Sequence, residues 1–585
     1  MRQLTGLLEK ERDAYSPADA PPKPYPRFFF WCVVLVLGLL NVWARRNDVT
    51  PDSISYIEIG WATARGGLHQ LVNAYWSPLY PFLLSLIFRL FYPAVQWDFT
   101  AAHVLNLAFY LASFASFGLF QNELDLQREA VGELAGKYLP VLPRTMWIWG
   151  SIFFLWAGCF WLGPVWVTPD LCVAALVYLA TALLFRIRGG RGNWLVFAGL
   201  GVLLGLEYLA KAAMFPLAFI FLLSAFCLSR IAGSSFLAAA LRTLIATVVF
   251  VGIALPFVLA LSAAKGRPTF GDSGRINYAE FVNRATRSVH WQGEPAGTGT
   301  PLHASRKIFS DPNVFEFSSP VPGSYSPWFD PSYWYDGVRP HFSVKAQAWA
   351  LFRASNMYLK IFSKSGALWV VLALILVVRR KLLGWGRPSS GAWLVFLPSL
   401  AALAMYSLVL VEFRYVAPFA LMLLMWMLSR MKIATGAGPL LVRRFHFVII
   451  LAPALAIAWA AGRDLYDIAR NKPYEPWVVA QRLHEMGIPP GTDVGYIGTG
   501  LDAYWAHLAG VRIIAEIPDE QQPRFIGAVA ARRQQVLALF SSVGAKAVVT
   551  KNANAANVAD GWRPIPGTHH FIWQQDWLIA APEQK

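Results

Sequence analysis

Long apolar segments recur along almost the whole sequence, and they restrict its fold more than any other feature. Of the 585 residues, 56% are hydrophobic and 15% are charged. Most apolar runs are about 17 to 25 residues long, the length that a helix needs to cross a bilayer. The sequence therefore predicts an all-α polytopic membrane protein with about 11–13 transmembrane helices, and it excludes a soluble fold. The predicted segments are 28–44, 78–92, 99–121, 145–161, 168–186, 193–210, 212–231, 236–264, 360–379, 390–411, 414–431 and 444–463.

The charge distribution indicates a membrane environment and no nucleic-acid partner. The formal net charge is +17, but the basic residues cluster at the ends of apolar segments, as at 186–188, 379–381, 430–432 and 443–444. Basic residues beside membrane helices normally stay on the cytoplasmic side. We therefore expect a multi-pass protein of the inner (plasma) membrane, with the loop 265–350 and the C-terminal region on the outer, periplasmic side.

The same orientation predicts that one apolar segment does not cross the membrane. An odd number of predicted helices separates the outer loop 45–77 from the outer loop 265–350, whereas an even number is needed to place both loops outside. The region 78–161 is the expected source of this mismatch, because the link 122–144 mixes acidic and basic residues and gives no clear orientation.

Three parts are predicted along the chain. Residues 1–27 form a cytoplasmic tail that precedes an uncleaved first helix. Residues 28–463 form the transmembrane part with its two outer loops. Residues 464–585 form a small periplasmic α/β domain. The predicted elements of this domain are strands at 493–497 and 545–550 and a helix at 524–540.

Two kinds of site are not predicted. The four cysteines lie inside apolar segments without metal-ligand spacing, so the sequence indicates neither a disulfide framework nor a zinc site. The segment 495–500 follows a predicted strand but does not match the dinucleotide-binding fingerprint, so no nucleotide cofactor is expected. The cysteines are Cys32, Cys159, Cys172 and Cys227.

The first outer loop gives the best indication of function. Asp52 and Tyr56 are four residues apart, and the pattern that follows favours an amphipathic helix over 53–65 that lies along the membrane surface. Asp52 is either the N-cap of this helix or a catalytic acid that meets a lipid-linked substrate, with Asp48 as a weaker alternative. Glu58 falls on another face and is interpreted as a solvated or salt-bridged residue.

Other ionisable residues lie in or against apolar segments, where a charge normally has a partner or a function. Glu207 and Lys211 have the spacing of an intrahelical ion pair. Arg414 lies beside Glu412 at the outer end of a helix, where it either snorkels to the interface or binds phosphate oxygens. Asp170 begins a helix and is either its cap or a functional acid.

The loop 265–350 combines aromatic side chains with charged ones. Aromatic faces beside carboxylates suit sugar rings, and an interfacial aromatic belt produces the same pattern, so both interpretations stay open. The residues concerned are Trp291, Tyr325, Trp328, Asp330, Tyr333, Trp334, Tyr335, Asp336 and Arg339.

Five short motifs together resemble the C-type membrane glycosyltransferases. The resemblance is to the bacterial relatives of the dolichyl-phosphate-mannose protein mannosyltransferases and of the lipid A aminoarabinose transferase. Its carriers, in the family's order, are residues 52–56 for D-E-x-x-Y, 77–81 for P-P-L-Y-P, 168–170 for T-x-D, 205–211 for G-L-A-x-L-T-K and 414–418 for R-Y-L-L-P.

By this resemblance, the chain transfers a sugar from a polyprenyl phosphate to a glycan, lipid or protein of the cell envelope. Transfer takes place on the outer face with inversion at the anomeric carbon. Asp52 corresponds to the first-loop acid, which acts as general base on the acceptor hydroxyl or as a ligand for a divalent metal. Lys211 and Arg414 are the residues implied to neutralise the charge of the lipid phosphate. The substrate-binding residues implied are Tyr56, Asp170, Lys211, Arg414 and Tyr415.

The sequence departs from the family at two motifs. Ser53 replaces the second acid of the first motif, and Tyr75-Trp76 replaces the Glu-Lys pair that precedes P-P-L in the aminoarabinose transferase. The metal ligand and the phosphate contact of that enzyme are therefore not carried over. Two other functions remain open: a transporter or flippase of lipid-linked sugars, expected to carry ionisable residues at mid-helix depth, and an envelope scaffold.

Overall fold

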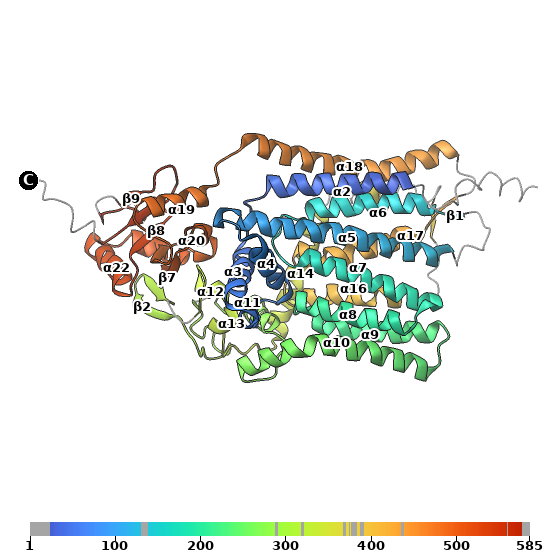
Figure 1. Cartoon of the computed structure of the whole chain (residues 1–585), viewed down its shortest axis with the longest axis horizontal. Coiled ribbons are helices and arrows are strands. Elements are labelled where there is room, and N and C mark those ends of the chain that lie inside the picture. The colour runs from blue at the N-terminus through green and yellow to red at the C-terminus, as the bar shows by residue number, and fades with distance from the viewer. Residues whose placement is uncertain are drawn as a thin grey trace, which may run out of the picture.

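The computed structural model shows a bundle of long helices with a sheet-containing region packed on one end (Figure 1). The structure describes residues 24–129, 138–286, 290–317, 321–364, 366, 370–373, 375, 383–385, 391–434, 438–557 and 560–575. Most of the predicted tail 1–27 therefore lies outside the described residues.

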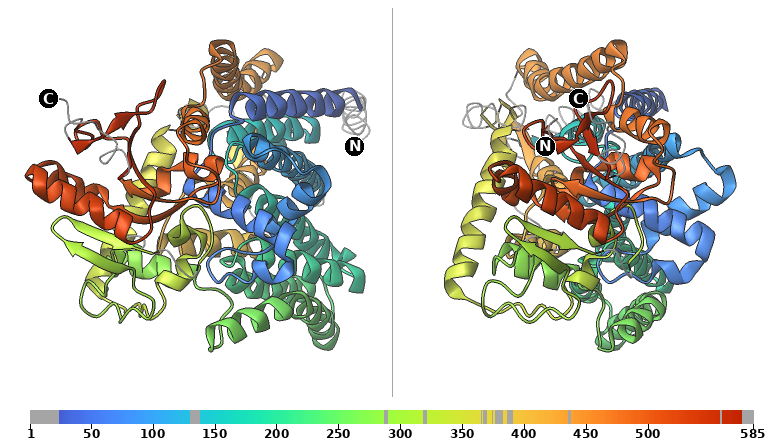
Figure 2. Two further views of the ribbon diagram at one scale, coloured as in Figure 1. Left: turned by 60° about the vertical axis from the view of Figure 1, so that its left-hand side comes forward. Right: turned by 90° about the vertical axis from the view of Figure 1, so that its left-hand side faces the viewer.

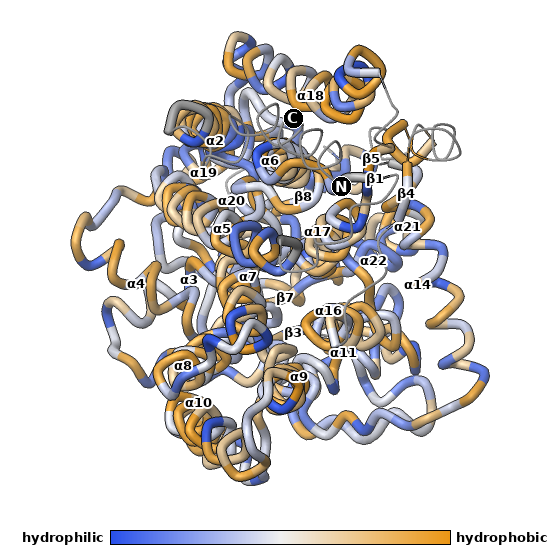
Figure 3. Tube along the Cα trace, turned by 90° about the vertical axis from the view of Figure 1, so that its right-hand side faces the viewer, coloured by the Kyte–Doolittle hydropathy of each residue, from blue (hydrophilic) through white to orange (hydrophobic). Residues whose placement is uncertain are grey.

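The helices of the bundle coincide with the predicted membrane segments. Six described helical stretches are long and apolar enough to cross a membrane. Helix α10 exposes Leu241, Leu244 and Val248, as expected of a lipid-facing helix, and Figure 3 shows apolar residues along most bundle helices. The chain is a multi-pass membrane protein, as predicted. The bundle helices are α2 (Pro24–Ala44), α5 (Asp98–Glu129), α6 (Pro143–Phe160), α7 (Asp170–Arg186), α8 (Trp194–Ala210), α9 (Met214–Ile231), α10 (Phe236–Lys265), α16 (Ala392–Ser407), α17 (Phe413–Ser429) and α18 (Pro439–Arg470).

Two predicted membrane segments, 360–379 and 78–92, differ from the bundle helices. The start of 360–379 belongs to α14 (Val344–Lys364), and most of the remainder lies outside the described residues. Segment 78–92 forms α4 (Leu79–Phe91), which lies beside α3 at the end of the bundle (Figure 1). At about 1.5 Å per residue, α4 is about 20 Å long, too short for the hydrocarbon core. If α4 does not cross, an even number of helices separates the two outer loops.

Helix α3 (Pro51–Gly66) forms where the first outer loop predicts a helix, but Asp52 is not its N-cap. Thr50 caps the helix instead: its hydroxyl accepts the Ser53 N–H at 3.3 Å, and the Ser53 hydroxyl accepts the Thr50 N–H at 3.0 Å. Proline favours the first helical position because it has no N–H to leave unpaired, so Pro51 begins the helix. The Asp52 carboxylate is therefore free for contacts outside α3. The helix is buried on several sides, between the bundle and the C-terminal region.

A seven-stranded sheet forms the core of the C-terminal region, in the order β2-β3-β7-β6-β8-β10-β9. The central strand β6 pairs in parallel with β7 and with β8. The predicted strands at 493–497 and 545–550 are confirmed as β6 and β8, whereas β2 and β3 come from the loop 265–350 and were not predicted. Figure 2 shows the two groups of strands packed together. The strands are β2 (Arg306–Ser310), β3 (Asn313–Glu316), β6 (Asp493–Ile497), β7 (Arg512–Ile517), β8 (Ala547–Thr550), β9 (Arg563–Pro564) and β10 (Phe571–Trp573).

Helices cover both faces of this sheet because strand residues point alternately to opposite sides. Val549 packs with α19 (Glu475–Glu485) and α20 (Tyr504–Ala509) in one core. Val548 packs with α22 (Ala530–Ser542) in another. The single helix predicted over 524–540 is divided, because α21 (Gln522–Ile526) ends at Gly527 before α22 begins.

A buried ion-pair network fixes the C-terminal region to the rest of the chain. His507 on α20 lies 3.1 Å from Glu58 on α3 and 3.2 Å from Asp98 at the start of α5. The Trp61 indole N–H donates to the same Asp98 carboxylate at 2.8 Å. Burial opposes protonation of the imidazole, but the two carboxylates outweigh it and raise the pKa of His507 to about 9. Glu58 is thus salt-bridged, one of the two outcomes predicted for it.

Candidate functional site

One cavity of about 450 Å³ is lined by all six site residues that the motif resemblance implies. It lies where α3, α7, α17 and the end of α8 meet beneath the segment 267–277. Asp52 and Arg414, which are in direct contact, are 362 positions apart in the sequence. The six residues are Asp52, Tyr56, Asp170, Lys211, Arg414 and Tyr415.

Arg414 connects two carboxylates of this cavity. Its Nη2 donates to Asp52 Oδ2 at 2.7 Å, and its Nε lies 3.6 Å from Asp170 Oδ2. The other oxygen of Asp52 accepts the indole N–H of Trp328 at 3.3 Å. The side chain of Arg414 is 15% exposed and that of Asp52 is 22% exposed, so a ligand in the cavity can reach the pair. Arg414 therefore points into the site and does not snorkel to the interface.

Lys211 pairs with Asp170 and not with Glu207, so the predicted intrahelical pair is wrong. Its ammonium lies 2.6 Å from Asp170 Oδ1 and 3.3 Å from the centre of the Tyr415 ring. The i, i+4 rule requires both residues to be helical, but α8 ends at Ala210 and Lys211 has an extended backbone. The side chain is thereby turned towards α7. Glu207 is buried, and its carboxylate has no hydrogen-bond partner among the described residues.

Asp170 is the most enclosed acid of the site. It is the first residue of α7, and its side chain does not cap the helix. Its carboxylate is 4% exposed and accepts the Thr168 hydroxyl at 2.8 Å in addition to its two cationic contacts. Such a fully paired carboxylate is suited to holding Lys211 and Arg414 in place.

Tyr56 lies one turn after Asp52 on α3. Its ring is buried, with edge contacts to Trp76 at 5.1 Å and to Tyr80 at 5.2 Å between ring centres. Burial raises the pKa of Tyr56 well above its usual range, and the nearby Asp52 carboxylate adds to the effect. The phenol therefore stays protonated, so it can donate a hydrogen bond but cannot serve as a base.

The cavity also contains a cationic cluster that sequence reasoning missed. Asp272, which is buried, lies 2.6 Å from Arg267 and 3.3 Å from Arg275. Burial lowers the pKa of Arg275 from its ordinary value, and the nearby Asp272 only partly offsets this. The alternation of basic and acidic residues directly after the apolar segment 236–264 was the available signal. With Lys211 and Arg414, the site holds four cations and three acids, a net positive charge.

Part of the cavity lining is apolar. This part includes Pro216, Phe270, Met405, Val409 and Leu410, contributed by α9, by the segment after α10 and by α16 with the turn that follows it. A lining that combines cations with apolar side chains suits an amphiphile with an anionic group.

Most aromatic residues of the loop 265–350 are structural. Trp291 and Tyr335 stack in a local core with ring centres 5.9 Å apart, and Tyr325 donates to Glu516 at 2.6 Å. Trp328 contacts Asp52, as described above. Neither a sugar platform nor an aromatic belt accounts for this set as a whole.

The side chains present do not fit a divalent metal. Divalent cations such as Ca²⁺ and Mg²⁺ prefer several free oxygen ligands. Asp52, Asp170 and Asp272 are instead each in contact with a guanidinium or an ammonium group. Within the described part of the chain, no group of three His, Cys, Asp or Glu residues has a metal-binding arrangement.

Comparison with known proteins places the fold. No protein-family model matches the sequence, and no curated protein matches it. Among solved structures, ArnT from Cupriavidus metallidurans bound to undecaprenyl phosphate is 13% identical with a TM-score of 0.52, covering 94% of this chain and 98% of ArnT. The same protein in the apo state is 12% identical with a TM-score of 0.50, covering 94% and 99%. This chain shares its fold with ArnT.

A second similarity is weaker. The oligosaccharyltransferase of Archaeoglobus fulgidus in its apo form is 14% identical, with a TM-score of 0.47 over 90% of this chain and 70% of that protein. The fold that this chain shares with ArnT agrees with the resemblance predicted from the motifs.

Proposed function

We propose that this protein is a membrane glycosyltransferase that moves a sugar from a polyprenyl-phosphate donor to a glycan, lipid or protein of the cell envelope. The observation that carries the proposal is the contact between Asp52 and Arg414, 2.7 Å apart, in a cavity whose lining is net cationic and partly apolar. A donor needs these features together: cations for its phosphate, an apolar surface for its prenyl chain and a proton acceptor for the attacking hydroxyl.

The geometry supports the following reaction. The donor phosphate binds Arg414 and Lys211, which neutralise it and make it a better leaving group. Asp52 accepts the proton of the acceptor hydroxyl. The hydroxyl oxygen attacks the anomeric carbon from the face opposite the phosphate, the bond from that carbon to the phosphate oxygen breaks, and polyprenyl phosphate leaves. A single displacement of this kind inverts the anomeric centre.

The protein is proposed to lie in the inner membrane with this cavity on the outer side. The loop 265–350 and the region 464–585 would face the same side, because the basic cluster near 430–444 lies at the other end of the bundle. Lipid-linked donors presented on the outer leaflet would then reach the cavity directly.

The test is transfer of radiolabelled sugar from a panel of polyprenyl-phosphate donors by the purified full-length protein, with envelope extract as acceptor. Asp52→Asn removes the proton acceptor but keeps the shape, so we expect donor consumption to be lost. Asp467→Asn, in a salt bridge at the end of α18, is the matched control. Full activity of a folded Asp52→Asn protein would refute the assignment. No turnover of any donor by the wild type would favour the transporter instead.

A further inference from the structure

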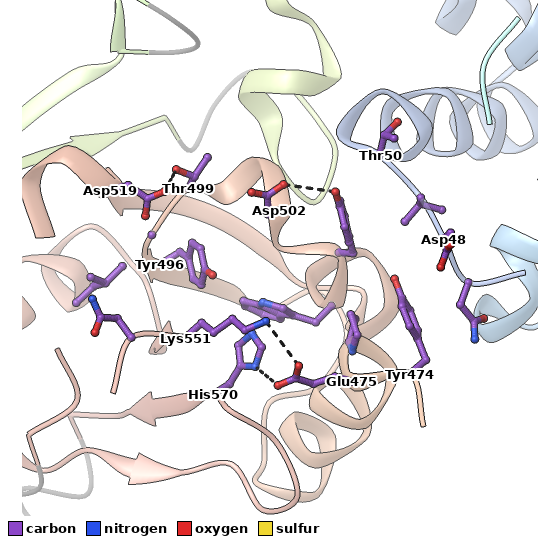
Figure 4. A pocket seen from close by; sticks show the side chains of 18 of the residues that line it. Asp48, Thr50, Tyr474, Glu475, Tyr496, Thr499, Asp502, Asp519, Lys551 and His570 are labelled. Carbon is purple, nitrogen blue, oxygen red and sulfur yellow. Dashed lines mark hydrogen bonds and ion pairs between the residues drawn. The ribbon is translucent and has the colours of Figure 1, made fainter. Parts of the chain in front are cut away.

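A second and larger cavity, of about 800 Å³, lies between the C-terminal region and the first outer loop. Figure 4 shows Asp48 and Thr50 of that loop on one side with Tyr474 beside Asp48, the group of Glu475, Lys551 and His570, and Tyr496 and Asp519 across the cavity. The mechanism proposed above uses none of these side chains.

The position of this cavity in the sheet is typical of a ligand site. Strand β6 lies between β7 and β8 and is parallel to both. The chain leaves β6 through α20 on one face of the sheet and enters β8 from α22 on the other. In sheets of this kind, ligands bind at the carboxyl ends of the strands where the connections change sides. The cavity is lined by residues that follow these three strand ends, at 498–499, 502, 519 and 551–552.

The lining is rich in acids and in tyrosines. Glu475 receives contacts from Lys551 at 3.6 Å and from His570 at 3.3 Å. Its partial burial disfavours the charge, but the hydrogen bonds from His569 and the charge of Lys551 lower the pKa of Glu475 to about 2. Burial also lowers the pKa of His570 to about 4, so this imidazole is neutral. Among the described residues, the lining holds one lysine and four carboxylates, which are Asp48, Glu475, Asp502 and Asp519. Asp48 is also paired with Arg45 at 3.4 Å, outside the cavity lining.

This chemistry distinguishes between classes of ligand. The excess of negative charge disfavours phosphates and nucleotides. Carboxylates accept hydrogen bonds from hydroxyl groups, and side-chain amides both accept and donate them. The rings of Tyr474, Tyr496 and Tyr504 offer apolar faces with a polar edge. A neutral or amino-substituted sugar matches both properties.

We propose that this cavity binds a sugar unit of a glycan acceptor. This proposal rests on the transferase function proposed above. The two cavities adjoin. Thr50 lines the larger cavity and caps α3, and Asp52 on the first turn of α3 lines the smaller one. Trp166 lines the larger cavity, and its ring centre is 5.8 Å from the guanidinium of Arg414. A glycan held at the strand ends would therefore extend one hydroxyl towards Asp52.

Binding is measured without donor, by saturation-transfer NMR and calorimetry on the full-length protein. The probes are maltotriose, tri-glucosamine, maltose carried on a lipid in nanodiscs and inorganic phosphate. Asp502→Asn and Tyr504→Leu should weaken sugar binding about tenfold or more, because each removes a contact made to the ligand. Glu485→Gln, an exposed acid on α19 outside the cavity, is the matched control.

The outcomes separate this proposal from the catalytic one. The Asp52→Asn protein should bind sugar like the wild type even though transfer is lost. Sugar binding without any transferase activity of the wild type would reject the proposed transferase function and leave the sugar site standing. Tighter binding of the lipid-carried maltose than of the free sugars would identify a glycolipid as the acceptor. Equal binding of the two would identify a free glycan. No sugar binding by the wild type, binding unchanged in both cavity variants, or binding of phosphate instead would overturn the sugar site.

Discussion

Replacing Arg414 by glutamine tests the centre of the proposed site. The guanidinium is 2.7 Å from Asp52 and 3.6 Å from Asp170, and it is 15% exposed, so a donor phosphate in the cavity can reach it. A hydrogen bond to a charged group contributes about 1.5–3 kcal/mol. Loss of this contact should therefore raise the KM for the donor by about 10- to 150-fold.

Arg414→Lys is the matched variant, because it keeps the charge but loses the planar fork that contacts two anions at once. We expect its donor KM to lie between those of the wild type and Arg414→Gln. The assay is initial-rate transfer at varied donor and saturating acceptor, with monodispersity in detergent as the control for folding. A donor KM for Arg414→Gln that equals the wild-type value, in a folded protein, would refute the phosphate-binding role.

Two further predictions concern the parts of the fold that position the site. The folded-state pKa of His507 is raised from 6.5 to about 9. Its ion pairs therefore stabilise the docked C-terminal region fully below about pH 6.5 and lose that effect as the pH rises through about 9, a change of about 3 kcal/mol in stability. Thermal unfolding from pH 6 to 10 should show this decline in the wild type and a flat profile in His507→Gln, and equal profiles for the two proteins would contradict the prediction. Thr50→Ala removes the capping box of α3 and should lower the free energy of unfolding by about 1 kcal/mol. We expect a lower Tm for Thr50→Ala and a wild-type Tm for Thr50→Ser. An unchanged Tm in Thr50→Ala would reject the capping role.

The parts of the fold that local composition determines were predictable from the sequence. The apolar length of α10 or α18 is itself the physical requirement for crossing a bilayer, and Val548 and Val549 lie in a short apolar run that suits a buried strand. Strands β2 and β3 were not predictable, because they are short, lie in a loop rich in glycine and proline, and depend on pairing with a distant strand edge.

The candidate site divides in the same way. The contact between Asp52 and Arg414 joins residues 362 positions apart, so only the motif resemblance, and no local pattern, suggested a shared site. The two errors beside it were local. Thr50-Pro51 was the stronger signal for a helix start than Asp52, because proline favours the first helical position. Lys211 was paired with Glu207 because its helix was assumed to continue, although the backbone becomes extended at that residue.

The sharing of Arg414 by two carboxylates also predicts the order of substrate binding. In the structure, Asp52 Oδ2 is occupied by the guanidinium at 2.7 Å and Oδ1 by the Trp328 indole at 3.3 Å, so an acceptor hydroxyl meets a carboxylate that is already hydrogen-bonded. A donor phosphate competes for Arg414 and thereby frees an oxygen of Asp52 to accept a proton. Asp170 keeps Lys211 and Arg414 in place meanwhile, through its contacts at 2.6 and 3.6 Å.

We therefore expect an ordered reaction in which the donor binds before the acceptor. Polyprenyl phosphate, as the product that occupies Arg414, should inhibit competitively against the donor and non-competitively against the acceptor. Arg414→Gln should lose this order, because Asp52 is then free in the absence of donor. Inhibition patterns that are competitive against both substrates would show random binding and would contradict the coupling, since a base released by the donor cannot be equally available without it.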